Sequence, residues 1–233
     1  MLRNPGLLRG SARRGGESAQ DAMVLSAARH VFGRDADLDP WREALSELDG
    51  DDLVPPVAQL SAGISHRVTL GRWLYAALRV TCPAAVVETG VASGTSSWLI
   101  LNALARNGTG ALCSIDLPNR DPTQPYNVGE ETATGRVVPD SLRPRWQLSL
   151  GDSRVLLPKL LAETGPPGLF FHDSDHSLEA MTREFETVLP RLEPGGLIVS
   201  DDVQKNRAFA RVTRSHGLRS FTFRKGGTAR KDG

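Results

Sequence analysis

Short apolar runs alternate with helical segments from residue 84 onward, and this alternation constrains the fold more than any other feature. Strands that alternate with helices pair in parallel and form a sheet covered on both faces. The runs are apolar throughout, which is typical of strands buried on both sides. The sequence therefore predicts an α/β fold with a doubly wound, mostly parallel sheet. Its five strands are expected at Ala85–Val87, Ala111–Ile115, Trp146–Leu150, Gly168–Phe171 and Gly196–Val199.

The segments on either side of this domain, which we place at residues 83–225, have a different character. Residues 1–20 carry arginines among Gly and Ser and are expected to form a disordered basic tail. Residues 21–82 are predicted to form an N-terminal helical extension, because their apolar residues recur at helical spacing. After the fifth strand only Arg219 to Arg224 has strand character, so we expect a shortened C-terminal strand pair. Residues 226–233 are expected to be a flexible tail.

Composition argues against several classes of protein. Lys and Arg number 28 against 27 Asp and Glu, which argues against nucleic-acid binding through bulk charge. No run approaches the roughly 20 apolar residues of a membrane-spanning helix, so no membrane partner is expected. Two cysteines, Cys82 and Cys113, are too few for a disulfide framework or a zinc cluster. We interpret them as buried thiols in a reducing compartment and expect a cytoplasmic protein.

An acidic residue follows every predicted strand at its carboxyl end. Open parallel sheets bind ligands in the crevice outside those ends. A single acid can be a helix cap, and Asp152 also fits that interpretation. Five in succession are harder to explain as caps and indicate a ligand site. The five acids are Glu88, Asp116, Asp152, Asp173 and Asp201.

The loop after the first strand, E-T-G-V-A-S-G-T-S from residue 88 to 96, indicates which ligand binds there. Gly90 and Gly94 allow a tight turn and a close approach of the backbone, and the following helix presents free N–H groups. The spacing differs from the dinucleotide motif G-x-G-x-x-G, because Ala92 stands at the second glycine position. The carboxylate of Glu88 suits a cationic group better than a pyrophosphate, and Asp116 could accept hydrogen bonds from ribose hydroxyls. S-adenosylmethionine has these features.

Residues 88–202 resemble the class I S-adenosylmethionine-dependent methyltransferases. The loop form E-x-G-x-x-x-G-x-S is similar to that of the catechol and caffeoyl-coenzyme-A type O-methyltransferases. The resemblance implies a Rossmann-like sheet in which the glycine loop holds the methionine part of the cofactor. It also implies that Asp116 binds the ribose and that Asp152 lies near the adenine. The expected cofactor-binding residues are Glu88, Gly90, Gly94, Thr95, Ser96, Asp116, Asp152 and Ser153.

A second acidic group follows the fourth and fifth strands. Asp173 is expected to approach Asp201 and Asp202, because neighbouring parallel strands end at the same edge. Three carboxylates without an obvious cationic partner would repel each other, and a bound Mg²⁺ would relieve this. Metal-dependent O-methyltransferases have this pattern, so the resemblance implies that these three residues are metal ligands. The alternative is a metal-free enzyme in which the acids are caps and cofactor contacts.

His176 lies three residues after Asp173. The resemblance to metal-dependent methyltransferases that act on sugars of natural products suggests a histidine at this place. We therefore interpret His176 as a general base and expect His176 and Asp173 to be the catalytic residues. The alternative is that His176 only caps a helix or faces solvent. His172 is expected to be structural, at a buried strand end.

The predicted function is O-methylation of a small hydroxylated acceptor of the sugar or natural-product type. One alternative is an NAD-dependent oxidoreductase, which shares the alternating topology and the acid after the second strand. Another is a degenerate, non-catalytic protein of the same fold. The long segment 117–145 has five prolines and is a candidate for covering the substrate. A homo-oligomer is compatible with the sequence.

Overall fold

A five-stranded parallel sheet forms the centre of the computed structural model, which describes residues 17–50, 65–118, 134–223 and 229–232. The strand order is β3-β2-β1-β4-β5, so the chain adds strands first on one side of β1 and then on the other. This confirms the predicted doubly wound α/β fold. All carboxyl ends therefore meet at one edge of the sheet. The strands are β1 Ala85–Thr89, β2 Ala111–Asp116, β3 Trp146–Leu150, β4 Leu169–His172 and β5 Leu197–Ser200.

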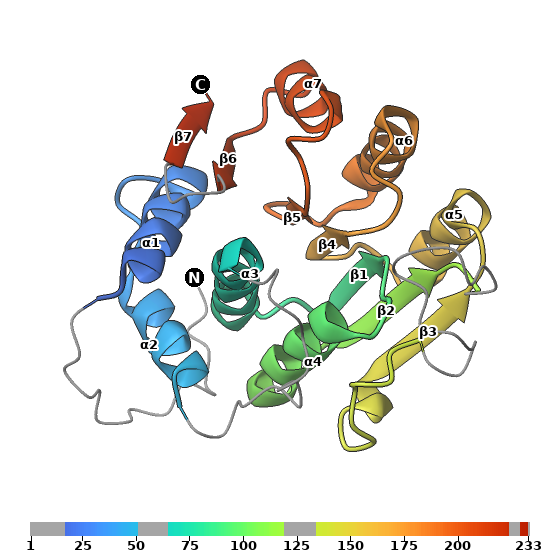
Figure 1. Cartoon of the computed structure of the whole chain (residues 1–233), viewed down its shortest axis with the longest axis horizontal. Helices are drawn as coiled ribbons and strands as arrows, with labels where there is room; N and C mark the ends of the chain where they lie inside the picture. The colour runs from blue at the N-terminus through green and yellow to red at the C-terminus, as the bar shows by residue number, and fades with distance from the viewer. Residues whose placement is uncertain (1–16, 51–64, 119–133, 224–228, 233) are drawn as a thin grey trace.

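Helices cover both faces of this sheet (Figure 1). One face packs on the helices α5 Ser153–Glu163, α6 Leu178–Val188 and α7 Ala208–Ser215, with Val87 and Phe170 pointing into that core. The other face packs on the N-terminal helices and α4, and the alternate residues of the strands point into the core on that side. The helices of that side are α1 Ala19–Phe32, α2 Asp39–Leu48, α3 Ser65–Thr81 and α4 Thr95–Asn107. Short 3-10 helices lie at Arg143–Arg145 and Leu189–Arg191.

The N-terminal extension is joined to the domain by a buried charged group. Arg79 of α3 is 1% exposed and donates from Nε and Nη2 to the two carboxylate oxygens of Glu47 at 2.7 and 2.8 Å. Its Nη1 also donates to Asn107 at the end of α4. The hydroxyl of Tyr75 donates to Glu47 at 2.9 Å, and burial raises the pKa of Tyr75. These contacts connect α2, α3 and α4.

The chain ends of the structure differ from expectation in two places. Strand β7, Ala229–Asp232, pairs antiparallel with β6, Ser220–Phe223, within the segment that we expected to be a flexible tail. The two form a separate sheet, because β5 pairs only with β4 in the described residues. Helix α1 begins at Ala19, inside the expected basic tail, after Ser18 accepts a hydrogen bond from the amide of Asp21 at 3.1 Å. Residues 1–16 of that tail lie outside the described residues.

Within the described ranges, no helix is both long and apolar enough to cross a membrane.

Candidate functional site

The glycine loop between β1 and α4 is fixed by close backbone packing. Gly90 has a φ of +85°, and a Cβ there would collide with the carbonyl oxygen of Asp173. Gly94 has a φ of +94°, and a Cβ there would lie 2.7 Å from the Cα of Gly135. A positive φ strains residues that carry a Cβ, so both positions need glycine. The loop therefore lies directly against the carboxyl end of β4.

Glu88 lies beneath this loop rather than facing a ligand across it. Its side chain is fully buried and accepts hydrogen bonds from the hydroxyls of Ser96, Ser97 and Ser114 at 2.6, 2.6 and 2.7 Å. Burial raises the pKa of this carboxyl, although the three hydroxyls oppose the shift. Ser96 therefore also points into the protein, and its hydrogen bond to Glu88 supports the start of α4. Thr95, the first residue of α4, is partly buried, and its hydroxyl lies 3.4 Å from that of Ser93.

Asp116 holds the glycine loop from the end of β2. Its Oδ2 accepts hydrogen bonds from the amides of Val91 and Ala92 at 3.0 and 2.7 Å, and its Oδ1 accepts one from Leu117 at 2.8 Å. A carboxylate has about four lone-pair sites, so these three bonds do not exhaust its capacity. The side chain is only partly buried. It remains able to accept a further hydrogen bond from a hydroxyl.

Asp152 and Ser153 begin α5. Asp152 is the cap, because its Oδ1 accepts from the amide of Arg154 at 2.8 Å, while its Oδ2 pairs with the guanidinium of the same residue. The hydrogen bonds from Arg154 hold the pKa of Asp152 below its ordinary value. Ser153 points inward and donates to Glu184 at 2.6 Å. Both residues therefore have structural contacts at the place where the resemblance put the adenine.

The described end of the long segment 117–145 lies on the glycine loop. The amide of Gly135 donates to the carbonyl of Ala92 at 2.9 Å, and that of Val137 donates to the carbonyl of Ser93 at 3.1 Å. Val138 is buried in the core on the α4 side. Residues 119–133 lie outside the described residues. Gly135 and Val137 thus contact the loop that was expected to hold the cofactor.

The acids after β4 and β5 have a cationic neighbour that the sequence argument overlooked. Lys205 Nζ lies 2.7 Å from Asp202 Oδ2, and Asp202 has a φ of +50°. Asp201 is buried, and its amide donates to the carbonyl of His172 at 3.0 Å. No group of three His, Cys, Asp or Glu side chains could hold a metal ion in the part of the chain that the structure describes. The described residues thus do not gather Asp173, Asp201 and Asp202 into a metal-binding group, and the ammonium of Lys205 lies beside Asp202.

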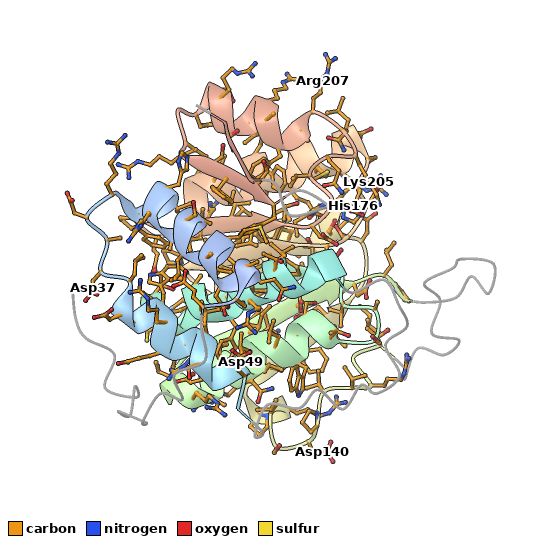
Figure 2. The ribbon with its side chains drawn as sticks, turned by 60° about the vertical axis from the view of Figure 1, so that its left-hand side comes forward. Asp37, Asp49, Asp140, His176, Lys205 and Arg207 are labelled. Carbon is orange, nitrogen blue, oxygen red and sulfur yellow. The ribbon has the colours of Figure 1, made fainter. Side chains whose placement is uncertain are left out.

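His176 lies at the same end of the molecule as Lys205 (Figure 2). Its side chain is 16% exposed, and its Nε2 lies 3.7 Å from Oδ1 of Asp173. This nitrogen is buried, and within the described residues it has no hydrogen-bond partner. Burial lowers the pKa of the ring, and the nearby His172 and Lys205 lower it further. A neutral imidazole with a free nitrogen can accept a proton.

Glu184 is a further polar residue at the site, and the sequence argument did not identify it. It lies on the sheet-facing side of α6 and is 1% exposed. It contacts the side chains of Thr89, Ser153, His172 and Ser174. A glutamate in an amphipathic helix is usually exposed. The only sign of burial in the sequence is the helical spacing, which places Glu184 on the same face as Met181 and Val188.

Comparisons with known proteins agree with this architecture. No curated protein matches the sequence. Among solved structures, CalS11, a TDP-rhamnose 3'-O-methyltransferase of calicheamicin biosynthesis, is 15% identical with a TM-score of 0.52, and the match covers 91% of this chain and 93% of that one. A methyltransferase from Geobacter sulfurreducens is 21% identical with a TM-score of 0.49, covering 81% and 83%. An O-methyltransferase from Bacillus cereus, solved with S-adenosylhomocysteine (SAH), is 15% identical with a TM-score of 0.48, covering 85% and 86%. At these identities the likeness is one of fold.

The family comparison goes further than the fold. A family model described as "Methyltransferase domain" matches residues 87–203, which run from β1 past the end of β5. The match includes the glycine loop, Asp116, the cap of α5, and the acids and His176 that follow β4. With its Rossmann-like sheet and this match, the chain belongs to the methyltransferase family.

Proposed function

We propose that this protein transfers a methyl group from S-adenosylmethionine to an oxygen atom of a small hydroxylated acceptor, of the sugar or natural-product type. The observation that carries the proposal is the glycine loop bonded to Asp116 at the carboxyl edge of the sheet. Open parallel sheets bind nucleosides at this edge. Family membership supports the reaction class, and among proteins that share the fold CalS11 is named for action on a deoxysugar nucleotide.

Binding of the cofactor requires backbone N–H groups for its carboxylate and a side chain that accepts hydrogen bonds from its ribose hydroxyls. The N-terminus of α4 begins after Gly94, so its first amides are available to a carboxylate group. Asp116 would accept hydrogen bonds from the ribose while keeping the loop amides in place. S-Adenosylmethionine supplies an electrophilic methyl group on its sulfonium. Glu88 would act beneath the loop by holding Ser96 and Ser97.

The acceptor half centres on His176. Its imidazole, neutral because its pKa is lowered, would take the proton of the acceptor hydroxyl as that oxygen forms its bond to the methyl carbon. The carbon–sulfur bond breaks in the same displacement, and the sulfur leaves as a neutral thioether. Asp173, 3.7 Å from the ring, would stabilise the imidazolium that forms. Lys205 lies beside Asp202, so one of the three acids after β4 and β5 has a cationic neighbour without a metal ion.

A calorimetric titration of the purified full chain with SAH tests the proposal, with NAD as the matched control. We expect micromolar binding of SAH and no heat with NAD. Heat with NAD and none with SAH would favour the oxidoreductase. No heat with either ligand would favour the degenerate, non-catalytic protein.

The role of His176 needs a separate measurement. Transfer of labelled methyl groups is followed across a panel of nucleotide sugars and phenolic glycosides, with and without EDTA. The variant His176→Ala should bind SAH normally and lose about 100-fold in turnover. A fully active variant would remove His176 as the base, and loss of activity in EDTA would restore the metal hypothesis.

A further inference from the structure

Glu184 gathers four side chains from three separate segments of the site. Its Oε1 accepts hydrogen bonds from the hydroxyls of Ser153 at 2.6 Å and Ser174 at 3.1 Å. Its Oε2 accepts one from Thr89 at 2.6 Å and lies 2.7 Å from Nδ1 of His172. A buried carboxylate is costly unless it is hydrogen-bonded, and here four donors surround it. These donors keep the pKa of Glu184 below its ordinary value although burial alone would raise it.

Each donor stands next to a residue of the site. Thr89 precedes Gly90 of the glycine loop, Ser153 follows the cap of α5, and Ser174 follows Asp173. The three segments reach the sheet edge after β1, β3 and β4. A main-chain bond joins the segments after β1 and β4, from the amide of Asp173 to the carbonyl of Thr89 at 2.8 Å. Glu184 therefore connects the cofactor loop, α5 and the start of the acceptor half through a single carboxylate.

His172 carries this connection on to His176. Its ring is fully buried, and its Nδ1 would donate to the ionised Glu184. The ring packs edge-on against that of His176, with centroids 5.4 Å apart and planes at 82°. On its other side His172 contacts Phe185 at 5.4 Å and 70°. A change in the orientation of His172 would therefore be passed directly to His176.

We propose that Glu184 is a positioning residue that holds the glycine loop and His176 in one arrangement, through Thr89 and His172 respectively. The proposal rests on the proposed function, because it assigns the purpose of the arrangement to methyl transfer. Glu184 itself is 1% exposed, so it lies beneath the residues that it holds. Its effect is exerted through the residues that it holds, since a buried polar network has one fully satisfied geometry.

The test compares Glu184→Gln and Glu184→Asp in the full chain. Glu186→Gln is the matched control, because Glu186 lies on the same helix, is partly exposed and pairs with His216 at 3.0 Å. Two properties are measured: SAH affinity by calorimetry and the imidazole nitrogen resonances of His172 and His176 by NMR. Thermal unfolding establishes that each variant is folded.

The amide of Glu184→Gln cannot accept from all four donors, so SAH affinity should fall about tenfold and both histidine signals should shift. Glu184→Asp should recover part of the affinity, because it keeps the charge. Glu186→Gln should move neither property. A folded Glu184→Gln with SAH affinity changed less than about twofold and unmoved His176 signals would overturn the proposal.

A second variant covers the case in which Glu184→Gln does not fold. Ser153→Ala with Ser174→Ala removes two of the four donors and leaves the carboxylate, His172 and Thr89 in place. This double variant should stay folded, shift the His172 signals and weaken SAH about threefold. Unchanged signals and affinity would overturn the proposal. If the parent itself binds no SAH, the proposed function fails, and the shifts of His172 and His176 still decide whether Glu184 positions them.

Discussion

Ala92 adopts a left-handed backbone conformation at the centre of the glycine loop. Its φ is +47°, which costs a residue with a Cβ roughly 1–2 kcal/mol. Two hydrogen bonds hold it there, because its amide donates to Asp116 at 2.7 Å and its carbonyl accepts from Gly135 at 2.9 Å. The position corresponds to the second glycine of dinucleotide motifs, which the sequence replaces by alanine. The loop thus keeps the left-handed conformation at residue 92 although no glycine stands there.

Replacing Ala92 by glycine should therefore raise stability. The relief of strain exceeds the added entropy of the unfolded chain, so we expect the free energy of unfolding to rise by about 0.5–1 kcal/mol. Urea denaturation at pH 7 measures the difference, and Gly108→Ala, at another positive φ of +70°, should lower stability. A loss of stability in Ala92→Gly would show that the loop does not strain this residue.

Asp116 holds the glycine loop and is proposed to bind the ribose, and substitutions can separate the two roles. Asp116→Ala removes the acceptor of the Val91 and Ala92 amides and the expected ribose contact, so SAH affinity should fall about 100-fold. Asp116→Asn keeps one oxygen for the loop amides and should lose less affinity while unfolding like the parent. Calorimetry and thermal unfolding together measure both effects. Unchanged affinity in Asp116→Ala would refute the ribose assignment.

At the scale of elements, the strands were well predicted and the polar contacts beneath them were not. Each of the five predicted strands agrees with the structure to within two residues. The central strands β1 and β4 are buried and need continuous apolar runs, whereas the edge strand β3 is only partly buried. A shortened C-terminal strand pair was expected, but its second strand β7 lies in residues assigned to a flexible tail, because Ala229–Asp232 has no apolar pattern. The orientation of Glu88 could not be predicted, because it depends on hydroxyls of α4 and β2. The burial of Glu184 could not be predicted either, because it depends on donors from β1, α5 and β4.

Glu88 connects β1, β2 and α4, and its raised pKa makes this connection dependent on pH. Because the folded state binds its proton more tightly, its contribution to stability is complete below the ordinary glutamate pKa of 4.5 and is lost as pH rises through the raised pKa. Replacing it with a non-titrating residue, as in Glu88→Gln, should remove this decline. Urea denaturation from pH 5 to 7 should give a steeper fall for the parent than for the variant.

Glu184 does not interfere with that measurement. Its pKa is lowered in the folded state, so its stabilisation is present above the ordinary glutamate pKa and is lost at lower pH. The two carboxyls therefore act in separate pH ranges. Equal slopes for the parent and Glu88→Gln between pH 5 and 7 would contradict the assignment to Glu88.

At the scale of the molecule, the N-terminal helices and the methyltransferase domain share one core. Leu74 and Leu78 of α3 belong to the same apolar cluster as Ile100 and Leu104 of α4. Helical spacing predicted the N-terminal helices but not where they pack, because the sequence does not show which buried charges pair. Arg79 could be recognised only as a cation near the end of a helix. In the structure it meets Glu47, 32 residues earlier.

Arg79→Met tests whether the extension and the domain unfold as one unit. The substitution leaves Glu47 and Asn107 without their buried donor, so the free energy of unfolding should fall by about 3 kcal/mol. Because α3 and α4 still share the apolar core that contains Leu78 and Leu104, the transition should stay single when followed both by tryptophan fluorescence and by circular dichroism. The control Arg42→Met removes an exposed pair with Asp39 and should change stability by less than about 1 kcal/mol. Two separated transitions in Arg79→Met would show instead that the helical extension folds independently and that the shared core does not couple it to the methyltransferase domain.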